Sequence, residues 1–440
     1  MDLFSKILDC KDYISVVGLG YVGLPIAIAF AEKGLGVIGF DIDKKKLECC
    51  RSGIDYTGEV GGFRLEHSEI LFTDDERELR KAKFHVVAVP TPINRDHTPD
   101  LQPIICAAEA VGRNLARGSI VVFESTVYPG LTEDVFLPIL EAQSGLKCGE
   151  DFKIGYSPER INPGDRDHKL SNIIKIVSGC DAEALEQISA VYNLIVEAGT
   201  CPVRDIRTAE AIKVVENAQR DVNIAFINEV SMILDRMGID TNEVIDGMDT
   251  KWNALGFRPG LVGGHCIGVD PFYLIYAAEK TGGRSDLLMM SRTINDAMCD
   301  HISDNTINRL ALLDKPLSQC RVCILGFTFK ENCPDIRNSQ VFWIYNRLKE
   351  YHVELLVADP EADAEAVRDQ YGIELVNWEE ICDVDCVIVA VAHDGFRRLT
   401  TEEICGMFRQ EPDGPRILID VKGICHAAEL GERGFCYWRL

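Results

Sequence analysis

A glycine-rich turn between an apolar segment and a helical pattern constrains the fold of this chain more than any other feature. Residues 13–17 read Tyr-Ile-Ser-Val-Val, which predicts a buried strand, and Gly18-Leu19-Gly20-Tyr21-Val22-Gly23 follows directly. Residues 24–33 then have the pattern of a helix. In this context the GxGxxG spacing lets the backbone approach a pyrophosphate, whose charge meets the positive end of the helix. The sequence therefore predicts a dinucleotide-binding α/β domain at the N-terminus.

The residue that ends the next predicted strand indicates which dinucleotide binds. This strand, residues 36–40, leads into Asp41, about 20 residues after the glycines. A carboxylate at this position can bind the ribose diol, which favours NAD over NADP. The run Lys44-Lys45-Lys46 could instead attract a 2′-phosphate, although lysine runs are more often a solvated helix face. We expect NAD, and we include Lys46 among the candidate cofactor contacts.

Further candidate site residues follow three apolar segments that predict parallel strands. These segments are residues 84–89, 119–124 and 152–156. In an open parallel sheet the ligand crevice lies outside the carboxyl ends of the strands. Pro90, Thr91, Thr126 and Glu159 follow those ends and are therefore candidates. A helix cap or turn explains Thr126 equally well, and Glu159 could be a surface carboxylate.

One long helix is predicted from Ala209 to Met237. Apolar residues recur there at helical intervals, with no proline or glycine before Gly238. These apolar positions are Ile212, Val215, Val222, Phe226, Val230, Ile233 and Met237. At ~1.5 Å per residue such a helix can link two domains and support a dimer seam.

The same helix carries a polar face formed by Lys213, Asn217 and Arg220. The spacing of these residues places them on one side of the helix. They could form a solvated stripe, or Lys213 and Asn217 could present a cation and an amide to a bound oxygen atom.

A second glycine-rich segment, Gly263-Gly264-His265-Cys266, holds a candidate nucleophile. Asp270 follows four residues after the cysteine. Glycines allow the main chain to lie close against a ligand, and a thiol held there could attack an electrophilic carbon. The ordinary alternative is a buried cysteine in a turn.

The C-terminal third repeats the α/β pattern without a GxGxxG turn. Helices are predicted at residues 273–280 and 286–312, a boundary at 315–318, and strands at 321–325, 353–358, 386–392 and 417–421. We therefore expect an α/β protein with two Rossmann-like, doubly wound parallel-sheet domains, joined by the long helix and a helical middle domain. The expected domains are residues 1–200, 201–314 and 315–440.

Composition and charge exclude several classes of partner. The net charge of −24 argues against nucleic acid, since phosphate backbones select basic surfaces. Residues 1–13 have no apolar core of a secretory signal, and no uncharged apolar run is long enough to span a membrane. We expect a cytoplasmic protein whose 17 cysteines are reduced. Cys320 and Cys323 form a CxxC without a second pair, so we expect no metal.

Taken together, these segments resemble the UDP-glucose/GDP-mannose dehydrogenase family over nearly the whole chain. The residues that carry the resemblance are Gly18 to Gly23, 125–127, 157–159, Lys213 with Asn217, 263–266 with Asp270, 329–330 and 335–337. The resemblance implies NAD-dependent, four-electron oxidation of a sugar C6 alcohol to a carboxylate, through a thiohemiacetal and a thioester on Cys266.

The resemblance also assigns roles to the other candidates. Lys213, Asn217 and Asp270 would surround the oxyanion and the catalytic water, Glu159 would assist thioester hydrolysis, and Thr126 would place water or cofactor. The UDP-sugar would contact Glu159, Arg160, Lys213, Asn217, Arg258, Gly263, Gly264 and Lys330. Besides Gly18, Gly20, Tyr21, Val22, Gly23 and Asp41, the cofactor would contact Arg337, supplied by the partner subunit of a homodimer or higher homo-oligomer. One departure is Pro163, where many relatives have a second glutamate.

The substrate branch is indicated by the residue before Asp270. Many UDP-glucose and GDP-mannose enzymes have a lysine there, whereas this chain has Val269. The loop resembles the branch that acts on UDP-N-acetylglucosamine or UDP-N-acetylgalactosamine, and the choice between these C4 epimers stays open. The alternatives are a UDP-glucose or UDP-N-acetylmannosamine 6-dehydrogenase, a hydroxy-acid dehydrogenase that oxidises once, and a non-catalytic nucleotide-sugar sensor.

Overall fold

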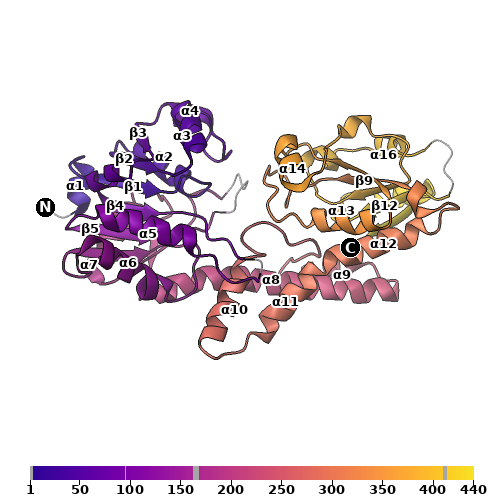
Figure 1. Ribbon diagram of the computed structural model, residues 1–440. Helices are drawn as coiled ribbons and strands as arrows, with labels where there is room; N and C mark the ends of the chain where they lie inside the picture. Colours follow the sequence, from indigo (N-terminus) through magenta and orange to yellow (C-terminus); the bar gives the residue numbers. More distant parts are fainter. Residues whose placement is uncertain (1–2, 95, 162–167, 410–413) are drawn as a thin grey trace. The chain divides into compact units, whose positions relative to one another are not determined.

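The computed structural model describes residues 3–94, 96–161, 168–409 and 414–440. Its contacts divide the chain into two units, each with its own parallel sheet (Figure 1). Unit 1 comprises residues 1–216 and 272–284, and unit 2 comprises residues 217–271 and 285–440. The predicted division into three domains stays a prediction.

The sheet of unit 1 has eight strands in the order β3-β2-β1-β4-β5-β6-β7-β8. They are β1 (Tyr13–Val17), β2 (Val37–Phe40), β3 (Ile70–Thr73), β4 (Ala82–Val87), β5 (Ser119–Phe123), β6 (Phe152–Tyr156), β7 (Lys175–Gly179) and β8 (Thr200–Pro202). Val17 of β1 pairs with Phe40 on one side and with Val87 on the other. The strand order reverses at β1, so the crevice of a doubly wound sheet lies outside the end of this strand.

Helices cover both faces of this sheet. They are α1 (Leu3–Leu8), α2 (Gly23–Glu32), α3 (Lys44–Arg51), α4 (Gly62–Glu66), α5 (Gln102–Asn114), α6 (Leu137–Ser144) and α7 (Ala182–Tyr192), with short helical turns at Glu76–Lys81 and Thr132–Phe136. On one face Tyr192 packs against Phe30 and Phe84, with ring centroids 6.3 and 6.0 Å away. On the other face Phe123 stacks on Phe136 at 4.8 Å. The doubly wound α/β architecture expected from the sequence is confirmed.

Two features of this sheet were not predicted. Strands β3, β7 and β8 had no strand signal in the sequence analysis, since they are short and two of them contain Lys175 or Pro202. In addition, β7 pairs with β6 in the antiparallel direction, with Tyr156 opposite Ser178. The first residue of β7 is thereby placed beside the carboxyl end of β6, which matters for Glu159.

Unit 2 has a five-stranded sheet in which every neighbouring pair is parallel, in the order β10-β9-β11-β12-β13. Its strands are β9 (Arg321–Leu325), β10 (Glu354–Ala358), β11 (Cys386–Val389), β12 (Ile417–Asp420) and β13 (Cys436–Arg439). Its helices are α9 (Thr241–Asp249), α11 (Asp286–Asp296), α12 (Met298–Leu310), α13 (Val341–Glu350), α14 (Ala364–Tyr371), α15 (Asp394–Arg397), α16 (Thr401–Met407) and α17 (Ala427–Glu432), with short turns at Leu317–Gln319 and Trp378–Glu380. Cys320 and Cys323 are buried in the core of this unit.

The prediction of one helix over residues 286–312 is wrong. The structure has two helices, α11 and α12, which are separated at Ala297. The backbone there has ψ −10°, far from the value of about −42° that continues an α-helix. The apolar spacing survives this break, so periodicity alone could not locate it.

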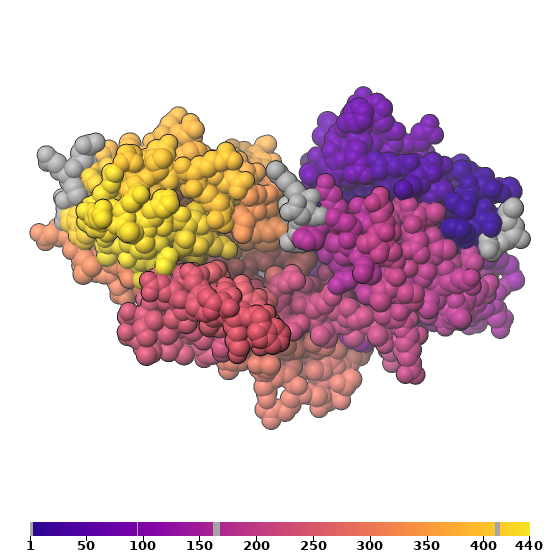
Figure 2. All heavy atoms as spheres, turned by 180° about the vertical axis from the view of Figure 1, so that it is seen from behind, coloured from indigo at the N-terminus to yellow at the C-terminus, as the bar shows by residue number. Residues whose placement is uncertain are grey.

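Strand β13, which was also not predicted, attaches the end of the chain to the helices of unit 2. The Trp438 indole donates a hydrogen bond to Asp235 at 2.9 Å, and Asn242 donates to the Leu440 carbonyl at 2.8 Å. Figure 2 shows the C-terminal part of the chain, in yellow, against the pink segment below it.

The long helix is confirmed as α8 (Ile206–Met237), but its apolar stripe is not buried. Val215, Phe226, Ile233 and Met237 are all about half exposed or more. The buried positions instead include Ala209, Val214, Ala218, Ala225 and Ile227. Within the described parts of the chain, none of the helices combines the length and apolar character needed to cross a membrane.

Candidate active site

The glycine turn after β1 has the geometry that a dinucleotide requires. Gly18 adopts φ +90°, and its N–H donates to the Phe40 carbonyl at 2.8 Å. A Cβ on Gly23 would lie 1.8 Å from the Gly18 carbonyl oxygen, so only glycine lets α2 begin so close to the turn. A Cβ on Gly20 would meet no atom within 4 Å, which leaves this side of the turn open. The residues present therefore fit a bound pyrophosphate at the start of α2.

Asp41 joins the end of β2 to this turn. Its carboxylate is mostly buried and accepts hydrogen bonds from the N–H of Leu19 at 2.8 Å and of Asp43 at 2.9 Å. The carboxylate is thus held beside the turn, as a ribose-binding acid would be. The exposed Lys44 pairs with Asp74 at 3.7 Å, and Lys46 lies in the first turn of α3.

Replacing Asp41 with asparagine is expected to improve the use of NADP. The amide oxygen can keep one of the two backbone hydrogen bonds, whereas the negative charge that repels a 2′-phosphate is lost. We expect the ratio of kcat/KM for NADP to kcat/KM for NAD to rise on the order of tenfold, which is about 1.4 kcal/mol. Comparable kcat/KM values for the two cofactors in the unaltered protein would instead show that Lys44 to Lys46 dominate.

The ends of β4 and β5 bring the next candidates together. The Tyr273 hydroxyl, on α10 (Asp270–Lys280), donates to the Thr91 carbonyl at 2.9 Å, while Ser125 donates to the Val89 carbonyl at 2.6 Å. Thr126 is half-buried directly after Ser125. These contacts hold the Pro90-Thr91 and Ser125-Thr126 segments in place, and their predicted contacts with cofactor stay predictions.

Glu159 is held in a buried cluster of charges, so its interpretation as a surface carboxylate is wrong. The side chain follows β6 and is only 7% exposed. Lys175 Nζ lies 2.9 Å from Glu159 Oε2 and 2.8 Å from Glu124 Oε2. Tyr192 donates a hydrogen bond to the other oxygen of Glu124. Arg160, a predicted substrate contact, instead pairs with Glu216 at 2.7 Å.

The two carboxyl groups of this cluster have opposite pKa shifts. Burial acts to raise both values, and it prevails at Glu124, whose pKa is raised. At Glu159 burial is outweighed by the Lys175 ammonium and by the N–H groups of Ile161 and Arg160, so its pKa is lowered. Glu159 is therefore the carboxyl group that stays ionised, while Glu124 holds a proton more readily.

In unit 2 the Cys266 loop ends at an acid–amide pair. The N–H groups of Val269 and Asp270 donate to the Cys266 carbonyl at 3.0 and 2.8 Å, which places the cysteine one turn before α10. Asp270 is buried and accepts a hydrogen bond from the Asn217 amide at 2.5 Å. Lys213 lies one turn earlier on the same helix and is half-buried. The interpretation of this helix face as a solvated stripe is therefore wrong at Asn217, although Arg220 is exposed.

Helix α8 also holds the beginning of this loop, through Asn228. The Asn228 amide accepts from the Gly260 N–H at 2.8 Å and donates to the Gly260 carbonyl at 3.0 Å. Asn228 is fully buried and also bonds Asn295 at 2.8 Å. Sequence reasoning missed this residue, although it lies three helical turns after Asn217 and thus on the same face. The loop that carries Cys266 is fixed to α8 at both ends.

The two glycines before Cys266 are required by packing against residues 327–340. A Cβ on Gly263 would lie 2.8 Å from the Asn338 carbonyl oxygen. Gly264 has φ +80°, and a Cβ there would lie 2.7 Å from the Phe329 ring. Asn338 also donates to the Gly264 carbonyl at 3.1 Å. The glycines thus let the loop lie directly on the segment that carries Lys330.

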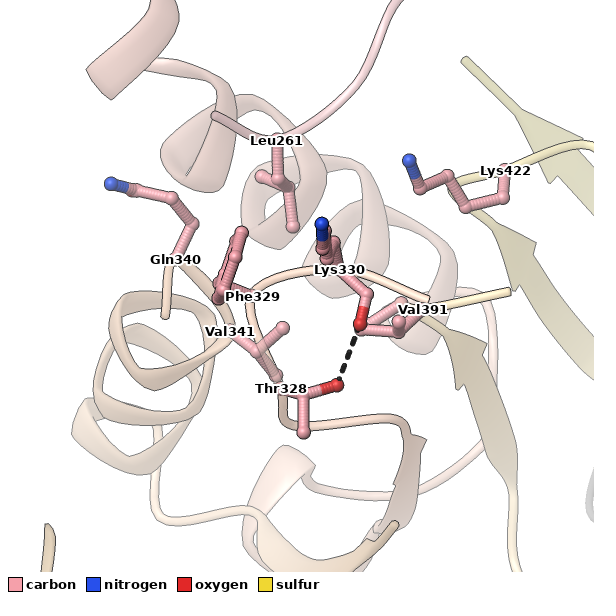
Figure 3. Close-up of a pocket in the computed structure, with 9 residues that line it drawn as sticks. Leu261, Thr328, Phe329, Lys330, Gln340, Val341, Val391 and Lys422 are labelled. Carbon is pink, nitrogen blue, oxygen red and sulfur yellow. Dashed lines mark hydrogen bonds between the residues drawn. The ribbon is translucent and has the colours of Figure 1, made fainter. Parts of the chain in front are cut away.

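A small pocket on the same segment presents two lysines (Figure 3). Its lining includes Leu261, Thr328, Phe329, Lys330, Gln340, Val341, Val391 and Lys422. Thr328 donates to the Lys330 carbonyl at 3.0 Å and so shapes the turn below this side chain. Lys330 and Lys422 make the pocket suitable for an anionic ligand. Lys422 was not predicted, since it lies far from Lys330 in the sequence.

The remaining candidates of unit 2 pair with acids. Arg258 lies 2.6 Å from Asp246, and Arg337 pairs with Asp335 at 2.5 Å and lies 3.3 Å from His265 Nδ1. Their predicted contacts with substrate and cofactor stay predictions. Pro163, the departure from the family pattern, lies outside the described residues.

A turn built for a dinucleotide in one unit, and in the other a loop cysteine followed by a buried acid that pairs with an amide of α8, define the class of this protein. It is a dinucleotide-dependent α/β oxidoreductase.

Comparison with known proteins gives the family. Models of the UDP-glucose/GDP-mannose dehydrogenase family match residues 12–196 (NAD-binding domain), 207–297 (central domain) and 323–427 (UDP-binding domain). The chain belongs to this family. It is an NAD-dependent nucleotide-sugar 6-dehydrogenase that acts on a UDP-sugar.

Individual relatives cover nearly the whole chain. Protein CapL of Staphylococcus aureus is 46% identical over 97% of this chain and 99% of its own length. The UDP-N-acetyl-D-glucosamine 6-dehydrogenase of Pseudomonas aeruginosa is 45% identical over 93% of this chain and 96% of its own. The solved structure of a UDP-D-ManNAc dehydrogenase from Pyrococcus horikoshii superposes with a TM-score of 0.87 at 28% identity, covering 97% of this chain and 98% of that one.

Proposed function

We propose that this protein oxidises the C6 hydroxymethyl group of a UDP-N-acetylhexosamine to the uronic acid, through a thioester on Cys266. The observation that carries this proposal is the Cys266 loop. It places a cysteine one turn before a buried acid–amide pair and is tied to α8 at Gly260 and at Asp270. A single oxidation of an alcohol needs no such nucleophile.

Cys266 makes the second oxidation of the sugar accessible. NAD supplies the hydride acceptor in both oxidations. An aldehyde has no good hydride to give until a nucleophile adds to it, and the Cys266 thiolate forms the C–S bond that turns the aldehyde into a thiohemiacetal. Oxidation of this adduct leaves a thioester. Water then adds to the carbonyl carbon, the C–S bond breaks, and the carboxylate and the thiolate are released.

The other candidates act on the charges and protons of these steps. Lys213 and the Asn217 amide stabilise negative charge on the C6 oxygen, and Asp270 transfers protons. Because Asn217 donates to Asp270 in the structure, the orientation of the carboxylate is set before substrate binds. Glu159 acts as the base for the water that cleaves the thioester, and its lowered pKa keeps it ionised for this role.

The choice of an acetamido sugar is supported by sequence similarity and by Val269. Identity is 45% to the UDP-N-acetyl-D-glucosamine enzyme and 28% to the UDP-D-ManNAc enzyme. Val269 is buried, so the position before Asp270 presents no charge of its own, where many UDP-glucose enzymes have a lysine. An acetamido group brings a methyl and an amide in place of a hydroxyl, which suits a less charged site.

A homodimer that uses α8 belongs to the same proposal. Phe226, Ile233 and Met237 are 58, 52 and 64% exposed in the single chain, which is unusual for large apolar residues at helical spacing. A second copy of α8 would cover them.

The proposal is tested by comparing nucleotide sugars as substrates. The value of kcat/KM is measured for UDP-N-acetylglucosamine, UDP-N-acetylgalactosamine, UDP-glucose and UDP-N-acetylmannosamine, and the NADH formed per sugar is counted. We expect one of the first two to be preferred, with two NADH and one uronate per sugar. A preference for either of the last two would reject the substrate assignment, whereas one NADH with a stable aldehyde would reject the mechanism.

A further inference from the structure

Lys175 lies on the buried side of Glu159, where a lysine side chain is unusual. Lys175 is 4% exposed and lies at the first residue of β7, beside the carboxyl end of β6. A buried ammonium group is costly unless it is paired, and this one has two carboxylates within 3 Å. Its carbon chain could be replaced by an apolar side chain if only packing were needed.

We propose that Lys175 is a positioning residue that fixes the carboxylate of Glu159 for its reaction with water. The inference rests on the role of Glu159 in the proposed function and extends it to a residue that touches neither sugar nor cofactor.

The hydrogen bonds of Glu159 show which oxygen can act as the base. Its Oε1 accepts from the N–H groups of Arg160 and Ile161, both at 2.7 Å, and these use its two lone pairs. Among the described residues, Oε2 accepts only from Lys175, at 2.9 Å. One lone pair of Oε2 is thus left for a water molecule, and Lys175 sets its direction.

The surroundings of Lys175 determine how strongly it acts on Glu159. Glu124 competes for the same ammonium group at 2.8 Å, and the Tyr192 hydroxyl donates to Glu124. The Tyr192 ring also lies 5.2 Å from Lys175 Nζ. The neighbouring Arg160 side chain is directed to Glu216 of α8. The positive charge that stabilises ionised Glu159 therefore comes from Lys175.

Substitutions at Lys175 and at Glu124 are expected to affect the pH profile differently. Lys175→Met removes the cation, so Glu159 takes up a proton at higher pH, and the acid limb of kcat should move up by about one pH unit or more. Glu124→Gln keeps Lys175 and replaces a carboxyl group that, with its raised pKa, takes up a proton before Glu159, so the acid limb should not move up. Lys175→Arg keeps the charge and should largely restore the profile. A role in packing alone would lower kcat without moving the acid limb.

Trapping of the acyl-enzyme gives a second measurement. The protein is quenched during turnover of UDP-N-acetylglucosamine with NAD, and the mass of the Cys266 peptide is measured. Lys175→Met should accumulate thioester at least several-fold over the unaltered enzyme at a pH between the acid limbs of the two proteins, because hydrolysis becomes slow there while oxidation continues. Lys153→Met is the matched control, since this lysine pairs with Asp181 and Glu183 in the same unit without touching Glu159. It should change neither the profile nor the thioester.

The outcomes separate this inference from the proposed function. If Glu159→Gln turns over at the full rate, the role of Glu159 itself is wrong. If Glu159→Gln slows hydrolysis but Lys175→Met leaves the acid limb unmoved, Lys175 is not a positioning residue. Should Lys175→Met fail to fold, Lys175→Gln decides, because its amide keeps a hydrogen-bond donor without the charge and an unmoved acid limb in that variant overturns the inference.

Discussion

Replacing Cys266 with serine is expected to reduce uronate formation by about 10³-fold or more. A serine hydroxyl is a far weaker nucleophile than a thiolate, so the aldehyde is not converted into an adduct that can lose a second hydride. The substitution preserves the loop, because Gly263, Gly264 and the hydrogen bonds to the residue 266 carbonyl are unchanged. Uronate is measured by chromatography, and NADH by absorbance within the first turnover.

A measurement of NAD binding distinguishes loss of the nucleophile from loss of the fold. The glycine turn and Asp41 belong to unit 1, so the Kd for NAD should stay within about twofold of the unaltered value. Cys382→Ser, at an exposed thiol of unit 2, is the control and should keep full activity. Uronate formed at an undiminished rate by Cys266→Ser would disprove a covalent intermediate on this residue.

The parts of the fold that the sequence predicts are those encoded by local patterns. The β1–turn–α2 unit was recognised because strand, glycines and helix are contiguous, and the structure confirms β1 at Tyr13–Val17. Helix α8 was predicted from the spacing of its apolar residues, but the sequence did not predict which face of the helix is buried. Val215 and Phe226 are exposed, while the small residues Ala218 and Ala225 are buried. The prediction followed the larger apolar side chains, because a hydrophobicity pattern gives them more weight than alanine.

The parts of the site that the sequence could not predict depend on pairing between distant segments. Lys175 is brought to Glu159 only because β7 pairs antiparallel to β6, a register that no local pattern encodes. The local sequence offered one signal of this buried lysine, namely that Lys175 directly precedes the apolar residues Ile176 and Val177. Asn228 was missed for a similar reason, since its partner Gly260 lies 32 residues away. Cys266 and Asp270 were found because they share one short loop motif, and Asn217 because its spacing from Lys213 places both on one face of α8.

The second large effect is expected at Gly23, with Gly20 as its matched control in the same turn. In Gly23→Ala the new Cβ would lie 1.8 Å from the Gly18 carbonyl oxygen and 3.2 Å from Val16. Because the first of these contacts is with a backbone atom, no change of side-chain rotamer can relieve it, and the start of α2 must move away from β1. Overpacking of this kind costs about 1–3 kcal/mol or more. We expect a lower free energy of unfolding of the apo protein and loss of measurable NAD binding.

Gly20→Ala distinguishes a damaged fold from a blocked ligand. Its Cβ would meet no atom within 4 Å and its φ is not positive, so the apo protein should keep its stability within about 0.5 kcal/mol. The added methyl group would nevertheless occupy the side of the turn that a pyrophosphate approaches, and we expect the Kd for NAD to rise at least about tenfold. Urea unfolding of the apo protein and a fluorescence titration with NAD measure the two quantities. If Gly20→Ala binds NAD as tightly as the unaltered protein, the pyrophosphate does not approach at Gly20. If Gly23→Ala is fully stable, the contact between α2 and the turn is looser than the structure shows.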